Sequence, residues 1–249
     1  MDTLAAPTSG ETTRKHRWYR RSSVWLVIGG SIPLLGLLGD PPDTMMLIFT
    51  IYVGVWFGRA RVTRLVASIP VSPAVISIGL CVVSGWIAES LAWTSSYLAA
   101  ESEPALLHPQ LIPDLILAVM YYGGWGVAWV VLRRRYDYST KEVFVLQGLY
   151  GVLLEQLGAV FLAGLFSMPL GLILWAYVFV VYGSIMGIAY LPIEPQVRRP
   201  GTLNGRWKPV ISFAVLLVVS LAVMLILGSL FDLLDLLPEK RFIGDHPFW

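Results

Sequence analysis

Residues 143–191 read VFVLQGLYGVLLEQLGAVFLAGLFSMPLGLILWAYVFVVYGSIMGIAYL and contain a single charged side chain, Glu155. Two apolar blocks, 143–166 and 170–191, lie on either side of the Ser-Met-Pro segment 167–169. Each block is long enough for a membrane-spanning helix, which needs about 20 mostly apolar residues. Because proline stops a helix at the preceding turn, the two blocks predict two spans joined as a tight antiparallel hairpin.

Five more apolar blocks occur along the chain, at residues 23–39, 44–58, 74–98, 111–132 and 209–231. The block 44–58 is marginal for a span, and it suffices if its helix tilts little or borrows from residues 62–69. Composition agrees with membrane helices, since 56% of the residues are hydrophobic and only 14% are charged, against about 25% charged in soluble domains. The sequence therefore predicts an all-α fold, a polytopic transmembrane helix bundle of about seven spans.

Lysine and arginine residues cluster in alternate connections between the predicted spans. All of the 18 except Lys240 and Arg241 precede the first span or fall in the second, fourth and sixth connections. The other three connections, residues 40–43, 99–110 and 167–169, contain no Lys or Arg. Because cytoplasmic loops are rich in these residues, the pattern predicts an N-terminus inside and a C-terminus outside.

This topology divides the chain into three parts. They are a basic cytoplasmic N-terminal tail (1–22), a seven-span membrane domain (23–231) and a short extracytoplasmic interfacial tail (232–249). Acids and leucines segregate at near-helical spacing in residues 231–238, which predicts a short interfacial helix on the outer surface. We expect an integral protein of a prokaryotic cytoplasmic (inner) membrane.

The third and fifth blocks share a local pattern, GWIAESLA at residues 85–92 and GVLLEQLG at residues 151–158. Each has a glycine four residues before a glutamate, followed by a polar residue, leucine and a small residue. The block after each one carries Tyr-Gly, at residues 122–123 and 182–183. The pattern predicts a duplicated helical hairpin in parallel order. Internal repeats are common in transporter folds, but two matched hairpins do not by themselves indicate transport.

Two carboxyl groups, Glu89 and Glu155, fall well inside predicted spans. An acidic side chain at the centre of a membrane helix costs about 2.5–3.5 kcal/mol on insertion scales, so such residues are candidates for function. At about 1.5 Å rise per residue, both lie at or slightly outside the membrane midplane. If the two carboxyls approach each other, one keeps its proton and can serve as a general acid or a proton-coupling site. We take both as candidate catalytic residues.

Further polar side chains fall near the same depth or at the outer entrance of the spans. The candidates for substrate binding are Tyr121, Tyr122, Tyr182, Gln156 and Asp114. The alternative for Asp114 is an ordinary helix N-cap after Pro113. The alternative for each glutamate is a protonated carboxyl that holds neighbouring helices together through hydrogen bonds.

Other site chemistries find little support in the sequence. The single cysteine, Cys81, excludes intrachain disulfides and cysteine-based metal clusters. The three histidines, His16, His108 and His246, fall on both sides of the predicted membrane. We therefore predict no metal site and no cofactor. The net charge of +2 gives no indication of nucleic-acid binding.

Three functions fit these residues. The first is an intramembrane enzyme that acts on a lipid or isoprenoid-like substrate by carboxylate acid/base chemistry. The second is a structural or assembly subunit of a larger membrane complex. The third is a small proton-coupled transporter, which requires a water path to both faces. Membrane lipids are the expected partners, together with a membrane protein if the second function holds.

Overall fold

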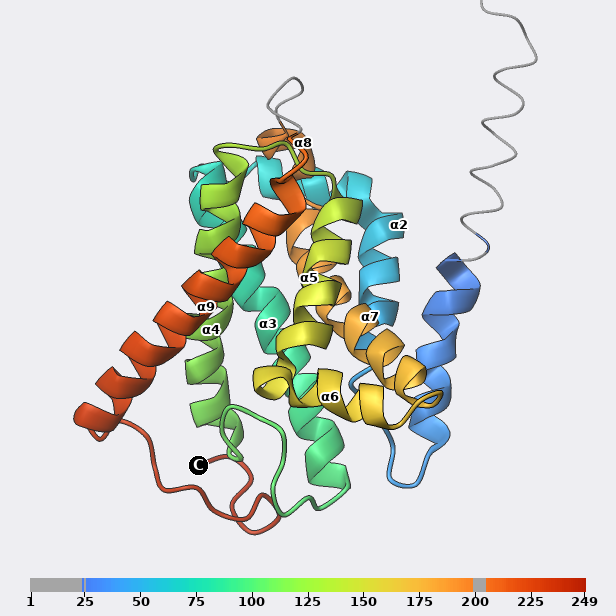
Figure 1. The fold of residues 1–249 in the computed structure, drawn as a ribbon, viewed down its shortest axis with the longest axis vertical. Helices are drawn as coiled ribbons and strands as arrows, with labels where there is room; N and C mark the ends of the chain where they lie inside the picture. Colours follow the sequence, from blue (N-terminus) through green and yellow to red (C-terminus); the bar gives the residue numbers. More distant parts are fainter. Residues whose placement is uncertain (1–23, 25, 199–204) are drawn as a thin grey trace, which may run out of the picture.

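The computed structural model describes residue 24 and residues 26–198 and 205–249, and the described part of the chain is all-helical (Figure 1). In chain order it contains a short apolar helix at Leu26–Leu38, which ends in the 3-10 helix η1 (Ile32–Leu38), then α2 (Leu47–Ala67), α3 (Pro73–Leu98), α4 (Leu111–Arg133), α5 (Thr140–Leu154), η2 (Glu155–Gly158), α6 (Ala159–Phe166), α7 (Gly171–Tyr190), α8 (Glu194–Val197) and α9 (Lys208–Leu233). No strand occurs among these residues, so the predicted all-α class is confirmed. The predicted basic tail 1–22 lies outside the described residues.

Five helical segments are long and apolar enough to cross a membrane: α3, α4, Thr140–Phe166, α7 and residues Lys208–Phe231 of α9. The predicted blocks 23–39 and 44–58 correspond to weaker elements. The helix at Leu26–Leu38 is short, whereas α2 has 21 residues but carries three arginines in its second half. Helix α2 does continue to Ala67, as a span starting near residue 44 requires.

Apolar side chains cover much of the outside of the bundle. On α9, Val218 is 64% exposed, Leu225 69% and Ile226 66%. Soluble monomers rarely expose large continuous apolar surfaces, because water makes them prone to association. The described helices are therefore compatible with a multi-pass membrane protein whose outer surface faces lipid.

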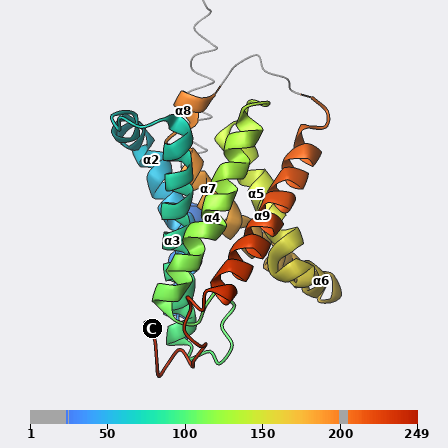
Figure 2. The same cartoon turned by 90° about the vertical axis from the view of Figure 1, so that its left-hand side faces the viewer.

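The long helices pack mainly as two pairs, α3 with α4 and α5 with α7. Helix α3 also contacts α7, which joins the two pairs, and α2 packs against α7 and also contacts α3. Helix α9 runs at an angle to the rest and rests on α4 and α5, as Figures 1 and 2 show. The result is a bundle in which α3, α4, α5 and α7 enclose the interior.

In each of the two helix pairs, a tyrosine ring packs directly against a glycine of the neighbouring helix. A Cβ atom added to Gly85 of α3 would lie 2.2 Å from Cγ of Tyr122 in α4. A Cβ atom added to Gly151 of α5 would lie 2.4 Å from Cγ of Tyr182 in α7. The same glycine-to-tyrosine contact thus occurs four residues before each glutamate, which supports the predicted duplication of the hairpin.

The predicted span 143–166 falls in a segment that is apolar and long enough to cross a membrane, but it is not one continuous helix, because the helix breaks at Glu155. Gln156 and Leu157 have φ values of +49° and +57°, and Gly158 has φ +90°. Left-handed backbone costs roughly 1–2 kcal/mol per residue outside glycine, and it turns the chain sharply. Helix α6 consequently lies across the bundle (Figure 1). Helix α7 still packs along α5, but the turn at 167–169 joins α7 to the short helix α6 and not to a full-length span.

The predicted interfacial helix at 231–238 is wrong. Helix α9 ends at Leu233, and residues 234–249 contain no helix. Instead this tail folds back under α4, where the N–H groups of Leu111 and Ile112 donate to the carbonyls of Pro247 (3.0 Å) and Phe248 (3.1 Å). The first N–H groups of a helix lack partners within it, so these two bonds give the tail an ordered position.

Replacing Gly85 with alanine should destabilise the protein, because the added methyl group collides with the ring of Tyr122. We expect the free energy of unfolding to fall by about 1–3 kcal/mol, as for other overpacked sites. The matched control is Gly79→Ala on the same helix, where an added Cβ meets nothing within 4 Å. That control should be neutral or slightly stabilising, since alanine favours helix by up to about 1 kcal/mol. Thermal unfolding in detergent compares the two, and equal effects would contradict the packing.

Candidate functional site

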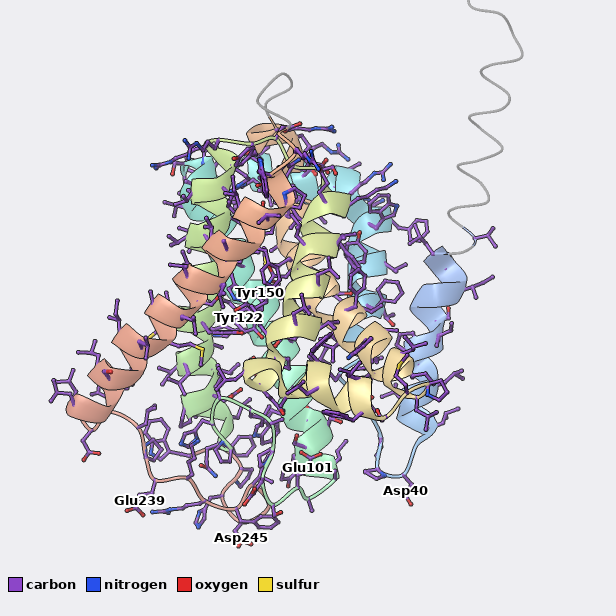
Figure 3. The ribbon with its side chains drawn as sticks, in the orientation of Figure 1. Asp40, Glu101, Tyr122, Tyr150, Glu239 and Asp245 are labelled. Atoms are coloured by element: carbon purple, nitrogen blue, oxygen red, sulfur yellow. The ribbon has the colours of Figure 1, made fainter. Side chains whose placement is uncertain are left out.

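A cavity of about 440 Å³ lies between α4, α5 and α9, and we call it the central cavity. Six of the predicted site residues line it, namely Glu89, Tyr121, Tyr122, Glu155, Gln156 and Tyr182. Figure 3 shows Tyr122 together with Tyr150, which also lines the cavity, in the interior of the bundle. Much of the remaining wall is leucine and methionine, including Leu217, Leu221 and Met224 of α9. The structure therefore brings together residues that the sequence places far apart.

Glu89 is held by a hydrogen bond from the neighbouring helix. The hydroxyl of Tyr122 donates to Oε1 of Glu89 at 2.7 Å. Tyr122 itself is buried, with 4% of its surface exposed, and its ring packs against Gly85 one turn before the glutamate. The close approach at Gly85 is what allows α4 to bring this hydroxyl to the carboxyl.

Asp114 lies behind Glu89 and does not line the central cavity. Oδ1 of Asp114 accepts the backbone N–H of His108 at 2.9 Å. Oδ2 is buried without a hydrogen-bond donor among the described residues, and its carboxyl neighbour is Glu89. A proton held between the two carboxyls would satisfy Oδ2, since two ionised carboxylates repel each other in an apolar interior.

The interpretation of Asp114 as a helix N-cap is wrong. Gln110 is the N-cap of α4, and Asp114 is the fourth residue of the helix. Its carboxylate reaches back to the N–H of His108, outside the helix, rather than to the first turn. The extended backbone of Gln110 sets the helix start three residues before Pro113, and proline is well tolerated in the first turn.

Glu155 stands at the break between α5 and α6. It lines the central cavity together with Gln156 and Leu157, the two residues in left-handed conformation. Among the described residues no hydrogen-bond donor is found for its carboxyl, in contrast to Glu89 with its tyrosine. Glu155 also interacts electrostatically with Glu89 across the cavity. The break thus presents a second, less constrained carboxyl to the same space.

An aromatic cluster around Trp125 packs behind the tyrosines that line the cavity. Its ring centroid lies 4.8 Å from Tyr121, 4.9 Å from Tyr122, and 5.6 Å from both Tyr150 and Tyr182. Trp125 is fully buried, and its indole N–H donates to Oγ of Ser220 at 3.0 Å. This tryptophan therefore orients all four tyrosines that line the cavity.

Three residues of the site, Trp125, Tyr150 and Ser220, were not predicted from the sequence. Trp125 follows Tyr121 and Tyr122 by four and three residues, a spacing at which side chains meet on one helix face, so the sequence held a signal for it. Tyr150 lies five residues before Glu155 and offers a weaker one. Ser220 sits in an otherwise apolar helix, and only the packing of α9 on α4 brings it to the site.

The connection between α3 and α4 closes the end of the cavity that is nearer the chain tail. Ala105, Leu106 and Leu107 line the cavity, and the chain tail holds the following residues in place. The side-chain amide of Gln110 donates to the carbonyls of Arg241 (2.9 Å) and His246 (3.0 Å). The tail, the connection and the start of α4 therefore form one hydrogen-bonded unit.

His108 is a buried titratable group within that unit. Its Nδ1 accepts the N–H of Gln110 at 3.1 Å, and its Nε2 lies 3.2 Å from the carbonyl of Pro238. This pairing fits a neutral ring protonated on Nε2. Burial lowers the pKa of His108, and Lys240 lowers it further, against the opposing effect of the Pro238 carbonyl.

A larger cavity, of about 710 Å³, lies at the opposite end of the bundle. Its charged groups are engaged with one another or with neighbours. Thr140 donates to Glu194 at 2.6 Å, Arg198 pairs with Glu194 at 3.6 Å, and Arg59 lies 4.9 Å from the ring of Trp56. Because these contacts explain the charges, we place the candidate site in the central cavity despite its smaller volume.

Acidifying the protein should loosen the tail through His108. Because burial places the folded-state pKa below that of the unfolded chain, the unfolded form takes up a proton first as the pH falls. Stability contributed by this unit is therefore fully present above the ordinary histidine pKa of about 6.5 and is lost progressively as the pH falls from there through the lower folded-state pKa. Hydrogen exchange at the amides of Leu111 and Ile112, which donate to the tail, should show lower protection at acidic pH.

The control is the variant His108→Gln, whose side chain does not titrate. Its protection at the same two amides should change little between the two pH values. An equal loss of protection in the wild type and the variant would assign the effect to another group, such as Asp114.

Among the described residues, no three His, Cys, Asp or Glu side chains converge where they could hold a metal ion. Comparison of the chain with protein-family models, with curated proteins and with solved structures found no match. The function must therefore be argued from the central cavity itself.

Proposed function

We propose that this protein is an intramembrane enzyme that acts on a lipid or isoprenoid-like substrate by acid/base chemistry at Glu89 and Glu155. One observation carries the proposal. Two glutamates, from matching positions of two helix pairs, line one cavity whose remaining wall is mainly apolar and aromatic. Carboxyl groups inside a membrane bundle cost free energy, so they are candidates for function. An apolar wall suits an apolar substrate.

The proposal includes seven spans, with the N-terminus in the cytoplasm and the C-terminus outside. Support comes from the distribution of charge over the ends of the bundle. The arginines in the second half of α2, those that end α4, and Arg198 after α8 share one end, whereas the connection 99–110 and the tail share the other (Figure 1). Figure 3 shows the labelled acids Asp40, Glu101, Glu239 and Asp245 at this second end. The positive-inside rule assigns the first end to the cytoplasm.

The two glutamates would divide the proton transfer between them. One carboxyl, in its protonated form, gives a proton to a carbon–carbon double bond of the substrate. The other, ionised, removes a proton from a neighbouring carbon, so that the product is an isomer and no oxidant or further reactant is consumed. A carbocation between these steps would be stabilised by the faces of the tyrosine rings around the cavity.

Tyr122 acts as a positioning residue in this scheme. Its hydrogen bond fixes the Glu89 carboxyl, whereas Glu155 lacks such a donor among the described residues. We therefore expect Glu89 to donate or remove a proton at one fixed point of the substrate. Glu155, whose carboxyl is less constrained, would carry out the other proton transfer. Tyr121, Tyr182 and Gln156 shape the space in which the substrate lies, and Asp114 supports Glu89 from behind.

Proton-coupled transport is the second candidate, and the break at Glu155 favours it. Interrupted helices at mid-membrane carry substrate and ion sites in many transporters, often within repeated hairpins. Transport is disfavoured because buried aromatic residues close the part of the bundle between the cavity and the arginine-rich end. Trp129 is fully buried there and donates to Gln147 at 3.2 Å. A transporter would need this layer to open.

Replacing either glutamate with glutamine should abolish the reaction with little change in shape. We expect conversion to fall by roughly 10²- to 10⁴-fold, the usual contribution of a general acid or base. The measurement compares apolar lipid extracts from cells with wild type, Glu89→Gln or Glu155→Gln by chromatography and mass spectrometry. The wild type should deplete one species and accumulate an isomer of equal mass.

The matched control is Glu103→Gln, on the exposed connection between α3 and α4 and away from the cavity wall. It should behave as the wild type does. If the variants lacking Glu89 and Glu155 both retained the wild-type lipid profile, the enzymatic proposal would fail.

Thiol labelling separates the enzyme from the transporter. The variant Glu155→Cys is prepared in a Cys81→Ser background and treated with a membrane-impermeant thiol reagent. If the cytoplasmic half of the bundle stays closed, the new thiol should react from the outer side and not from the inner side. We expect this one-sided labelling in sealed vesicles of both orientations. Labelling from both sides, altered by the proton gradient, would instead favour transport.

A further inference from the structure

A second cavity, of about 290 Å³, lies on the other side of Glu155, and we call it the side cavity. Its own wall includes Ala92 and Ser95 of α3 and Tyr177 and Val178 of α7. By itself it is smaller than the space of about 300–1,000 Å³ that usually holds a small-molecule ligand. It lies next to the central cavity, however, and the two spaces together exceed this lower limit.

The two cavities share part of their walls. Ala105, Leu106, Glu155, Gln156 and Tyr182 line both of them. The broken segment of α5 therefore forms the partition between the two spaces, with the Glu155 carboxyl on it. The central cavity extends from this partition toward α9, and the side cavity extends toward α3 and α7.

From this arrangement we infer that the two cavities are the halves of one slot, which binds a single long apolar chain alongside Glu155. The inference rests on the proposed function and specifies its substrate. A chain held on both sides of the carboxyl presents an internal double bond, rather than its end, to the acid.

The charges along the slot specify the polar end of the ligand. The acidic residues Glu89, Glu101 and Glu155 line it, and no Lys or Arg among the described residues does. A phosphate or diphosphate group would face repulsion without a cation to pair with. The ligand is therefore an uncharged isoprenoid such as an alcohol, and the hydroxyls of Ser95 and Ser96 in the side cavity offer hydrogen bonds to a neutral end group.

Probe alcohols of increasing length test the slot directly. Geraniol, farnesol and geranylgeraniol are added to the purified full-length protein in detergent, with farnesyl diphosphate as the charged comparator. A ligand that binds the folded form raises its melting temperature. We expect the rise to grow with chain length among the alcohols and to be absent for the diphosphate.

Filling the side cavity should shorten the preferred chain. Ala92→Phe removes space there and should weaken geranylgeraniol binding about tenfold, which is about 1.4 kcal/mol, while geraniol binding changes little. Leu217→Trp should do the same from the α9 side. The control is Ala163→Phe, on an exposed face of α6 outside both cavities, which should keep the wild-type preference.

Two results would overturn the slot. One is an unchanged length preference in Ala92→Phe, and the other is the absence of stabilisation by any of the three alcohols in the wild type. The outcome is separable from that of the enzymatic proposal. Suppose that the length preference shifts as expected but the glutamine variants convert lipid as the wild type does. The slot would then be supported, and the proposed reaction at Glu89 and Glu155 would be contradicted.

Discussion

A carboxyl group in the interior of an apolar helix bundle needs a hydrogen-bond donor, and Tyr122 supplies one to Glu89. The bond depends on Gly85, because any larger residue would hold α4 away from α3. Asp114 neighbours Glu89 and accepts the backbone N–H of His108, whose ring lies against the carbonyl of Pro238 in the tail. A series of contacts that begins at this hydrogen bond thus links the central cavity to the chain tail.

The second helix pair repeats the contact and then departs from it. Gly151 seats Tyr182 as Gly85 seats Tyr122, but α5 ends where α3 continues. The left-handed residues after Glu155 cost free energy, and such strain often persists at functional sites because the surrounding packing holds it. The effect of this asymmetry is that one glutamate is held by its partner helix, whereas the other stands on a partition between two cavities.

Several features of the fold and of the site were predictable from local pattern. Long apolar blocks predict the helices, and the shared depth of Glu89, Glu155 and the tyrosines predicts their meeting, because depth follows from the constant rise of a helix. The break at Glu155 was not predictable in the same way. Gln156 and Leu157 are ordinary helix-forming residues, and only Gly158 hints at a left-handed turn.

Long-range contacts account for the other differences. Whether residues 231–238 continue as helix depends on where the tail binds, and its partners at Gln110 and Leu111 lie more than a hundred residues earlier. Ser220 reaches Trp125 in the same way, through the packing of α9 on α4. Hydropathy reports how apolar a helix is, and it carries no information about which helix is its neighbour.

Native mass spectrometry after gentle extraction from the protein's own membrane tests the central claim most directly. The proposed enzyme should appear as this chain carrying a specific, uncharged apolar molecule, whose mass names the substrate class. A stoichiometric protein partner without such a molecule would contradict the account. It would identify the chain as a subunit of a larger membrane complex, and Glu89 and Glu155 would then be residues that hold helices together.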